Sequence, residues 1–123
     1  MNRRDYEKCA DQLFTEAADI EGAKRPGYTL GADDILTNFK VVAARAGVTP
    51  GQAWAVYFLK HIDAITAIMT RPDLPVSEAP SGRFADAINY LKLGYALWLE
   101  QNGFANSPDG GGTLDCGPCY IGK

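Results

Sequence analysis

Residues 49–70, TPGQAWAVYFLKHIDAITAIMT, hold the clearest structural signal in the chain. Thr49 can accept a backbone hydrogen bond as an N-cap residue, Pro50 suits the first helical position, and Gln52 completes a capping box. The apolar residues that follow recur every three or four positions, which predicts an amphipathic helix ending near Thr70. Its apolar face holds Trp54, Tyr57, Phe58, His61, Ile65, Ile68 and Met69.

The same helical period predicts three further helices, and convincing strand alternation is absent from the sequence. These helices are expected over residues 3–21, 32 or 33–46, and 81 or 82–102. Gly47 stands where a left-handed C-terminal cap is expected. Residues 22–31 contain the triplet Arg25-Pro26-Gly27, which predicts a break and a turn after the first helix.

The last predicted helix is apolar on two faces. Its main stripe holds Phe84, Ile88, Leu91, Tyr95 and Trp98, and a second stripe holds Tyr90, Leu93 and Leu97. Such a helix is either central to a bundle or paired with another subunit, and the second alternative would make the protein a homo-oligomer. The sequence therefore predicts an all-α, four-helix bundle-like domain over residues 1–103, followed by a flexible, glycine-rich tail over residues 104–123.

Composition narrows the class of protein. The chain has 123 residues, 46% hydrophobic and 22% charged, which suits one globular domain. The formal charge of −3 argues against nucleic acid as a partner. The run Ala53 to Leu59 is too short to cross a bilayer, and the N-terminus is charged where a signal peptide would be apolar. We therefore expect a cytoplasmic protein with no membrane partner.

The three cysteines do not form the framework of a secreted disulfide-rich protein. Cys116-Gly117-Pro118-Cys119 matches the thioredoxin active-site tetrapeptide, but no alternation of strands and helices precedes it, so the thioredoxin interpretation is rejected. A turn in the tail with incidental cysteines is favoured. A metal site between subunits or a disulfide in the tail is the alternative.

Polar residues within the helical pattern are the candidates for chemistry, because a buried charge needs a partner or a ligand. Acids, amides, cations and aromatics from three helices could meet at one end of the bundle, a combination that suits a nucleotide. Each also has a structural interpretation. His61 can be a hydrogen-bonded core residue, and Asp33 or Asp34 can stabilise a helix N-terminus. Lys60–Asp63 and Arg83–Asp86 can be surface ion pairs.

Several short motifs carry a resemblance to a known family. They are Lys24-x-x-x-Tyr28, Asp34-x-x-x-Asn38-Phe39, Lys60-His61, Glu78, and Arg83-x-x-Asp86-x-x-Asn89-Tyr90. The run from residue 24 to 98 resembles small phage and bacterial proteins of the nucleotide-modification-associated-domain type. Those proteins are in turn similar to the all-α nucleotide pyrophosphohydrolases, such as the MazG-like and dimeric dUTPase groups.

The resemblance implies an oligomeric helical bundle in which Mg²⁺ assists the attack of water on a nucleoside triphosphate and pyrophosphate is released. It implies that Asp86 and Glu78 are catalytic and that they bind Mg²⁺ together with Asp34. The residues expected to bind the nucleotide, or a related phosphate-bearing molecule, are Lys24, Tyr28, Asn38, Lys60, His61, Arg83, Asn89 and Tyr90.

The acidic residues depart from the pattern of that superfamily, which usually presents Glu-x-x-Glu on one helix and Glu-x-x-Asp on the next. This chain has Glu16-x-x-Asp19 and Asp86-x-x-Asn89, and an asparagine adds no negative charge for a metal. Three functions therefore stay open. They are hydrolysis of a nucleotide, binding of a nucleotide without cleavage, and assembly of a helical oligomer.

Overall fold

The computed structural model describes residues 1–76 and 78–103. These residues form four helices: α1 (Arg3–Thr29), α2 (Thr37–Ala46), α3 (Pro50–Thr70) and α4 (Pro80–Gln101). The prediction of an all-α fold is therefore confirmed. Within the described ranges, no helix combines the length and apolarity needed to cross a membrane. The predicted tail, including Cys116 and Cys119, lies outside these ranges.

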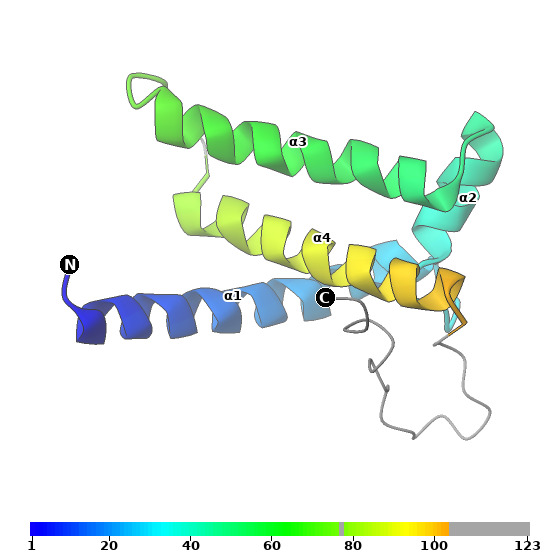
Figure 1. Ribbon diagram of the computed structural model, residues 1–123, viewed down its shortest axis with the longest axis horizontal. Helices are drawn as coiled ribbons and strands as arrows, with labels where there is room; N and C mark the ends of the chain where they lie inside the picture. Colours follow the sequence, from blue (N-terminus) through cyan, green and yellow to red (C-terminus); the bar gives the residue numbers. More distant parts are fainter. Residues whose placement is uncertain (77, 104–123) are drawn as a thin grey trace, which may run out of the picture.

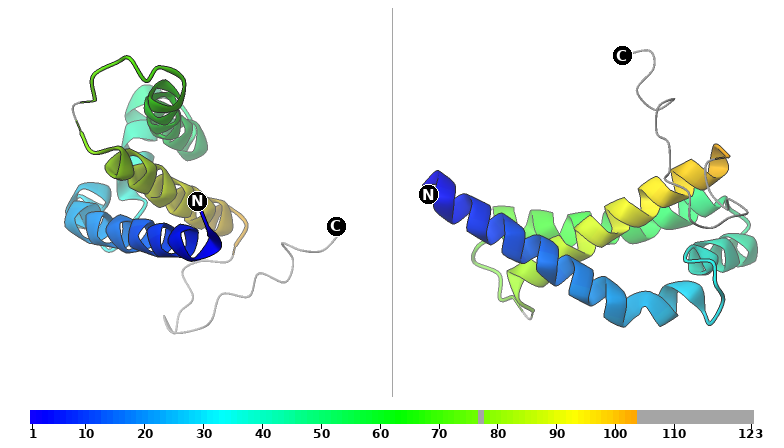
Figure 2. Two further views of the ribbon diagram at one scale, coloured as in Figure 1. Left: turned by 90° about the vertical axis from the view of Figure 1, so that its left-hand side faces the viewer. Right: turned by 90° about the horizontal axis from the view of Figure 1, so that it is seen from below.

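The central element is α4. It lies between α3 on one side and α1 on the other, and α2 crosses one end of this layer (Figure 1). Across the described residues, α1 and α3 do not pack against each other, whereas both pack against α4. Figure 2 shows the layer from its end and from below, where α1 and α4 cross at an angle. In this arrangement α4 links α1 to α3, while α2 packs against both of those helices.

The core gathers where α2 meets the layer. It contains Tyr28 of α1, Leu36 and Phe39 of the α2 region, and Tyr90, Leu93 and Leu97 of α4. Phe39 is fully buried, with no exposed surface. Burying an aromatic side chain of this kind stabilises the fold by about 1.5–3 kcal/mol relative to leaving it in water.

The predicted start of α3 is confirmed in detail. The Thr49 hydroxyl accepts a hydrogen bond from the Gln52 backbone N–H at 3.1 Å, and the Gln52 side chain accepts one from the Thr49 N–H at 2.9 Å. The helix ends at Thr70, as predicted. Gly47 also adopts the expected left-handed conformation after α2, with a φ of 71°.

The predicted break at residues 22–31 is wrong. The first helix continues to Thr29 with Pro26 inside it, and the left-handed backbone comes only after it, at Leu30 with a φ of 51° and Gly31 with a φ of 82°. A proline removes one helical hydrogen bond and crowds the carbonyl four residues earlier, here that of Gly22. Gly22 is exposed, so water can satisfy this carbonyl, and the end of α1 curves in this region (Figure 2). Burial of Tyr28 beyond the proline favours continuing the helix.

The predicted start of the second helix, at residue 32 or 33, is also wrong, since α2 begins at Thr37. The Asp34 carboxylate accepts a hydrogen bond from the Leu36 N–H at 2.8 Å, and the Thr37 hydroxyl donates to the Asp34 carbonyl at 2.7 Å. These local bonds satisfy the backbone in a turn and so compete with an earlier helical start.

The stripe of α4 that was predicted to be secondary is the more buried of the two. Tyr90, Leu93 and Leu97 are buried, whereas Leu91 of the predicted main stripe is 53% exposed. Tyr95 and Trp98 are also about half exposed. The reason is the aromatic core, because the side chains of Leu36 and Phe39 pack with Tyr90, Leu93 and Leu97 on only one face of α4.

Candidate functional site

Four of the predicted binding residues line one open pocket of about 330 Å³, which we name the Lys24 pocket. Lys24 and Tyr28 come from α1, Asn38 from α2, and Tyr90 from α4. Ala23 and Gly27 of α1 complete its lining. The continuation of α1 past Pro26 places Tyr28 one helical turn from Lys24. The helical segment found where a break was predicted therefore forms one wall of this pocket.

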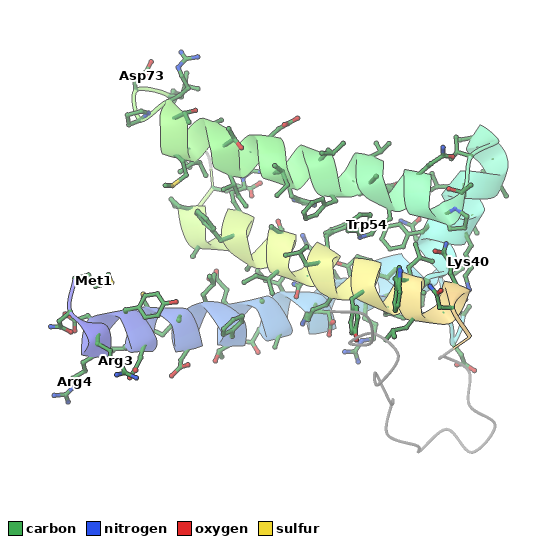
Figure 3. The ribbon with its side chains drawn as sticks, viewed as in Figure 1. Met1, Arg3, Arg4, Lys40, Trp54 and Asp73 are labelled. Carbon is green, nitrogen blue, oxygen red and sulfur yellow. The ribbon has the colours of Figure 1, made fainter. Side chains whose placement is uncertain are left out.

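The floor of the Lys24 pocket is aromatic. The ring of Tyr90 contacts Tyr28 edge-on at 6.1 Å between centroids and stacks on Tyr57 of α3 at 6.1 Å. The imidazole of His61 lies 4.6 Å from the same ring. Trp54 lies between α3 and α4 (Figure 3), and its indole N–H donates to the Tyr90 carbonyl at 2.7 Å. Contacts from α1 and α3 therefore fix Tyr90.

Beside this floor, the carboxylate of Asp86 on α4 lies close to one side chain of α1 and one of α3. Asp86 of α4 accepts a hydrogen bond from Lys24 Nζ at 3.1 Å, and its other oxygen lies 4.0 Å from His61 Nδ1. The Asp86 side chain is 13% exposed, whereas that of Lys24 is 52% exposed. The lysine head is thus accessible to a ligand, while the carboxylate beneath it is mostly covered.

Burial and charge shift the pKa values of the groups around Asp86. Burial lowers the pKa of His61, and the cations Lys60, Lys24 and Arg83 lower it further, although the Asp86 carboxylate opposes them. His61 is therefore neutral at pH 7. Its Nδ1 is buried without a hydrogen-bond partner. His61 is buried, as in the structural interpretation, but its Nδ1 lacks the expected hydrogen bond and lies 4.0 Å from the Asp86 carboxylate.

The two tyrosines of the pocket keep their phenol protons. Burial raises the pKa of Tyr28 to about 12, with the charges of Tyr90, Asp86 and Glu21 adding to the effect. Burial also raises the pKa of Tyr90, with contributions from Tyr57 and Asp86. Both phenols are therefore neutral at pH 7, where each can donate one hydrogen bond and accept others.

The other predicted binding residues lie elsewhere. Asn89 is 1% exposed and faces α1, where its side-chain N–H donates to the Ala17 carbonyl at 2.8 Å. Lys60 is exposed on α3. Arg83 forms an ion pair with Glu78 at 3.6 Å rather than with Asp86, and it lines a different pocket.

The three predicted Mg²⁺ ligands take part in three separate ion pairs. Asp34 pairs with Lys40, which also contacts Glu100 at 2.7 Å near the end of α4 (Figure 3). Burial acts to raise the pKa of Asp34, but hydrogen bonds from Lys40 and the Leu36 N–H outweigh it, so the pKa is lowered. Along α4, fourteen residues separate Asp86 from Glu100, about 21 Å. Asp86, Glu78 and Asp34 therefore do not form one set of metal ligands here.

Among the described residues, no three His, Cys, Asp or Glu side chains are grouped so that they could hold a metal ion. Mg²⁺ therefore stays an expectation of the family resemblance.

Three residues at the Lys24 pocket lie outside the predicted site: Ala23 and Gly27, which line it, and Tyr57, which supports it from α3. Gly27 was assigned to a turn, although its lack of a side chain leaves room beside Tyr28. Tyr57 was assigned only to the apolar face of α3, yet it stacks on Tyr90 and supports the pocket floor. An aromatic four residues before His61 on the same face was the available signal.

Comparisons of the chain with protein-family models, curated proteins and solved structures gave no match.

Proposed function

We propose that the protein binds a nucleotide, or a related phosphate-bearing small molecule, in the Lys24 pocket. The observation that carries the proposal is the meeting of Lys24, Tyr28, Asn38 and Tyr90 from three helices around one cavity of small-molecule size. The lysine ammonium can contact a phosphate, the tyrosines can contact a base or sugar, and the Asn38 amide can both donate and accept hydrogen bonds.

Binding without cleavage is the form that the geometry favours. Asp86, the central predicted catalytic residue, is held by Lys24, and the other two predicted acids contact different cations. A pocket whose cation is 52% exposed and whose carboxylate is mostly covered suits capture of an anion. The cytoplasm remains the expected compartment.

A screen of nucleotides by calorimetry, with and without Mg²⁺, tests the proposal. Lys24→Ala should weaken binding about tenfold to a hundredfold, since hydrogen bonds to charged groups contribute about 1.5–3 kcal/mol. Lys92→Ala is a matched control, because Lys92 is 48% exposed and also pairs across α1 and α4, with Glu21 at 3.6 Å. Absence of binding by every nucleotide, or equal losses in the two variants, would refute the proposal.

Hydrolysis is the second candidate, and the Asp86–His61 pair favours it, because a neutral imidazole beside a carboxylate can accept a proton. Asp86→Asn separates the two functions. If the protein only binds, this variant keeps or strengthens affinity for the anion, since a negative charge is removed. If the protein is a hydrolase, any turnover measured in the presence of Mg²⁺ is lost while binding persists.

Assembly into a homo-oligomer is a third proposal, and the half-exposed apolar stripe of α4 supports it. Leu91 in this stripe is 53% exposed. Light scattering of the natural chain and of Leu91→Glu tests it. An oligomer that dissociates in the variant supports assembly through this stripe, whereas a monomeric natural chain removes the proposal.

A further inference from the structure

A second cavity lies where α3 ends and the chain turns back into α4. It has a volume of about 170 Å³, and its walls are mostly apolar. Its apolar lining comes from three residues of α3 and three of the following loop: Ala64, Ala67, Ile68, Leu74, Pro75 and Val76. An apolar cavity of about 150 Å³ is large enough to bind benzene.

Two arginines complete this cavity, Arg71 at the end of α3 and Arg83 in the first turns of α4. We name it the Arg71–Arg83 pocket. The Arg83 side chain is 26% exposed, so its charge is screened less by water than that of Arg71, which is 58% exposed. A guanidinium beside an apolar wall recognises a planar carboxylate through paired hydrogen bonds.

The acidic partners of these arginines are loosely held. Arg83 lies 3.6 Å from Glu78, and Arg71 lies 3.5 Å from Asp73, both longer than the usual 2.7–2.9 Å or so of a charge-assisted hydrogen bond. Glu78 and Asp73 are 61% and 70% exposed, and Asp73 lies at the outer tip of the loop (Figure 3). A ligand carboxylate can therefore replace Glu78 at Arg83, because Glu78 is free to turn into water.

We propose that the Arg71–Arg83 pocket binds a small organic monocarboxylate whose apolar body, about the size of one ring, packs on α3 and the loop while its carboxylate accepts hydrogen bonds from Arg83. The volume limits the body to one ring or a short branched chain. The apolar wall gives no hydrogen bonds to a bare inorganic anion, and the arginines favour an acid over a neutral molecule.

Titration of the full chain with benzoate, followed by nuclear magnetic resonance, tests this proposal. Benzyl alcohol and inorganic phosphate serve as the comparison ligands. Benzoate should shift the signals of Ala64, Ala67 and Ile68 and bind more tightly than either comparison ligand. Equal binding of benzoate and benzyl alcohol, equal binding of benzoate and phosphate, or no benzoate binding would overturn the proposal.

Variants locate the binding in the pocket. Arg83→Ala should weaken benzoate binding about tenfold or more, because a charged hydrogen bond is lost. Arg45→Ala, an exposed arginine on α2, should change it less than twofold or so, since exposed charges contribute little. Ala67→Leu should block the apolar wall. Glu78→Gln changes only an exposed side chain and should tighten binding by removing the competing carboxylate.

Two outcomes of the variants contradict the proposal even if benzoate binds. One is a folded Ala67→Leu protein that binds benzoate as the natural chain does, because the ligand would then not use the apolar wall. The other is an unchanged or weaker affinity in Glu78→Gln, because the ligand would then not replace Glu78 at Arg83. Lys24→Ala should leave benzoate binding unchanged, so this proposal can fail or succeed independently of the nucleotide proposal.

Discussion

The interfaces on the two sides of α4 are built from different chemistry. Towards α3, the contact is aromatic, with the Tyr57 ring stacked on Tyr90 at 6.1 Å and the Trp54 ring placed against Gly94. Towards α1, the edge-on Tyr28–Tyr90 pair is joined by small and polar residues, with the Asn89 amide bound to the Ala17 carbonyl. We expect the α3 side to supply more of the stability, and the polar contacts of the α1 side to fix the position of the helix that forms the Lys24 pocket.

Polar contacts between α1 and α4 recur along their length. The Ser81 hydroxyl donates to Glu16 at 3.1 Å, Lys24 contacts Asp86 at 3.1 Å, and Lys92 contacts Glu21 at 3.6 Å. Exposed pairs of this kind each contribute at most about 1 kcal/mol, but they are directional and specify how one helix lies on the other. Aromatic burial gives more energy and less directional constraint.

The largest effect is expected from Trp54→Ala, which removes the ring at the centre of the α3–α4 interface. Truncation of a packed tryptophan costs about 3–5 kcal/mol, and here it also removes the hydrogen bond to the Tyr90 carbonyl. Chemical denaturation measures the change. If Trp54→Ala lowered the free energy of unfolding by less than a variant in the α1–α4 interface does, the comparison of the two interfaces would be contradicted.

Gly94→Ala should cost about 1–3 kcal/mol, because the added Cβ would overlap the Trp54 ring and lie 2.8 Å from its Nε1. In the Trp54→Ala background, the same Gly94→Ala substitution should raise the free energy of unfolding instead of lowering it. There the ring is absent, and alanine stabilises a helix interior over glycine by about 0.5–1 kcal/mol. The same denaturation experiment on the double variant checks this. Equal effects in both backgrounds would show that the ring does not limit residue 94.

Asn89→Ala should cost about 1 kcal/mol, since it removes the buried hydrogen bond to Ala17. Lys92→Ala, which removes a half-exposed ion pair to the same helix, should change the free energy of unfolding by less than about 0.5 kcal/mol. The difference between the two variants measures the buried contribution to the α1–α4 interface. An Asn89→Ala change as large as that of Trp54→Ala would reverse our ranking.

The smallest expected effect is at His61, which lies where the two interfaces meet. It shows only as a dependence of the free energy of unfolding on pH. Burial lowers its folded pKa below 6.5, so the unfolded chain binds its proton first as the pH falls. The stability from neutral His61 is therefore complete above pH 6.5 and is lost as the pH falls through the folded pKa. Because His61 is the single histidine, His61→Phe should remove this slope. A slope that persists in the variant belongs to other groups.

Much of the fold could be predicted because its signals are local. The capping box at Thr49 and Gln52 and the glycine at residue 47 act within one helical turn, so sequence spacing is enough to find them. The break expected at Pro26 failed for the opposite reason. The buried side chain of Tyr28 lies against Tyr90, a contact between residues 62 positions apart that no local rule contains.

The candidate site was predicted as a set of residue types and only partly as an arrangement. Lys24, Tyr28, Asn38 and Tyr90 share a pocket, whereas Asn89, one residue before Tyr90, binds the Ala17 carbonyl outside that pocket. Neighbouring residues on a helix point about 100° apart, so a motif that spans both cannot place them in one cavity.

The sequence by itself determined that this chain is helical and where α3 begins and ends, because periodicity and capping are written in neighbouring residues. Only the tertiary structure decided which stripe of α4 is buried. Both stripes are apolar, and the choice depends on where α2 and the aromatic core come to lie. It also decided which polar side chains meet at Asp86, since contacts among three helices follow from packing rather than from spacing along the chain.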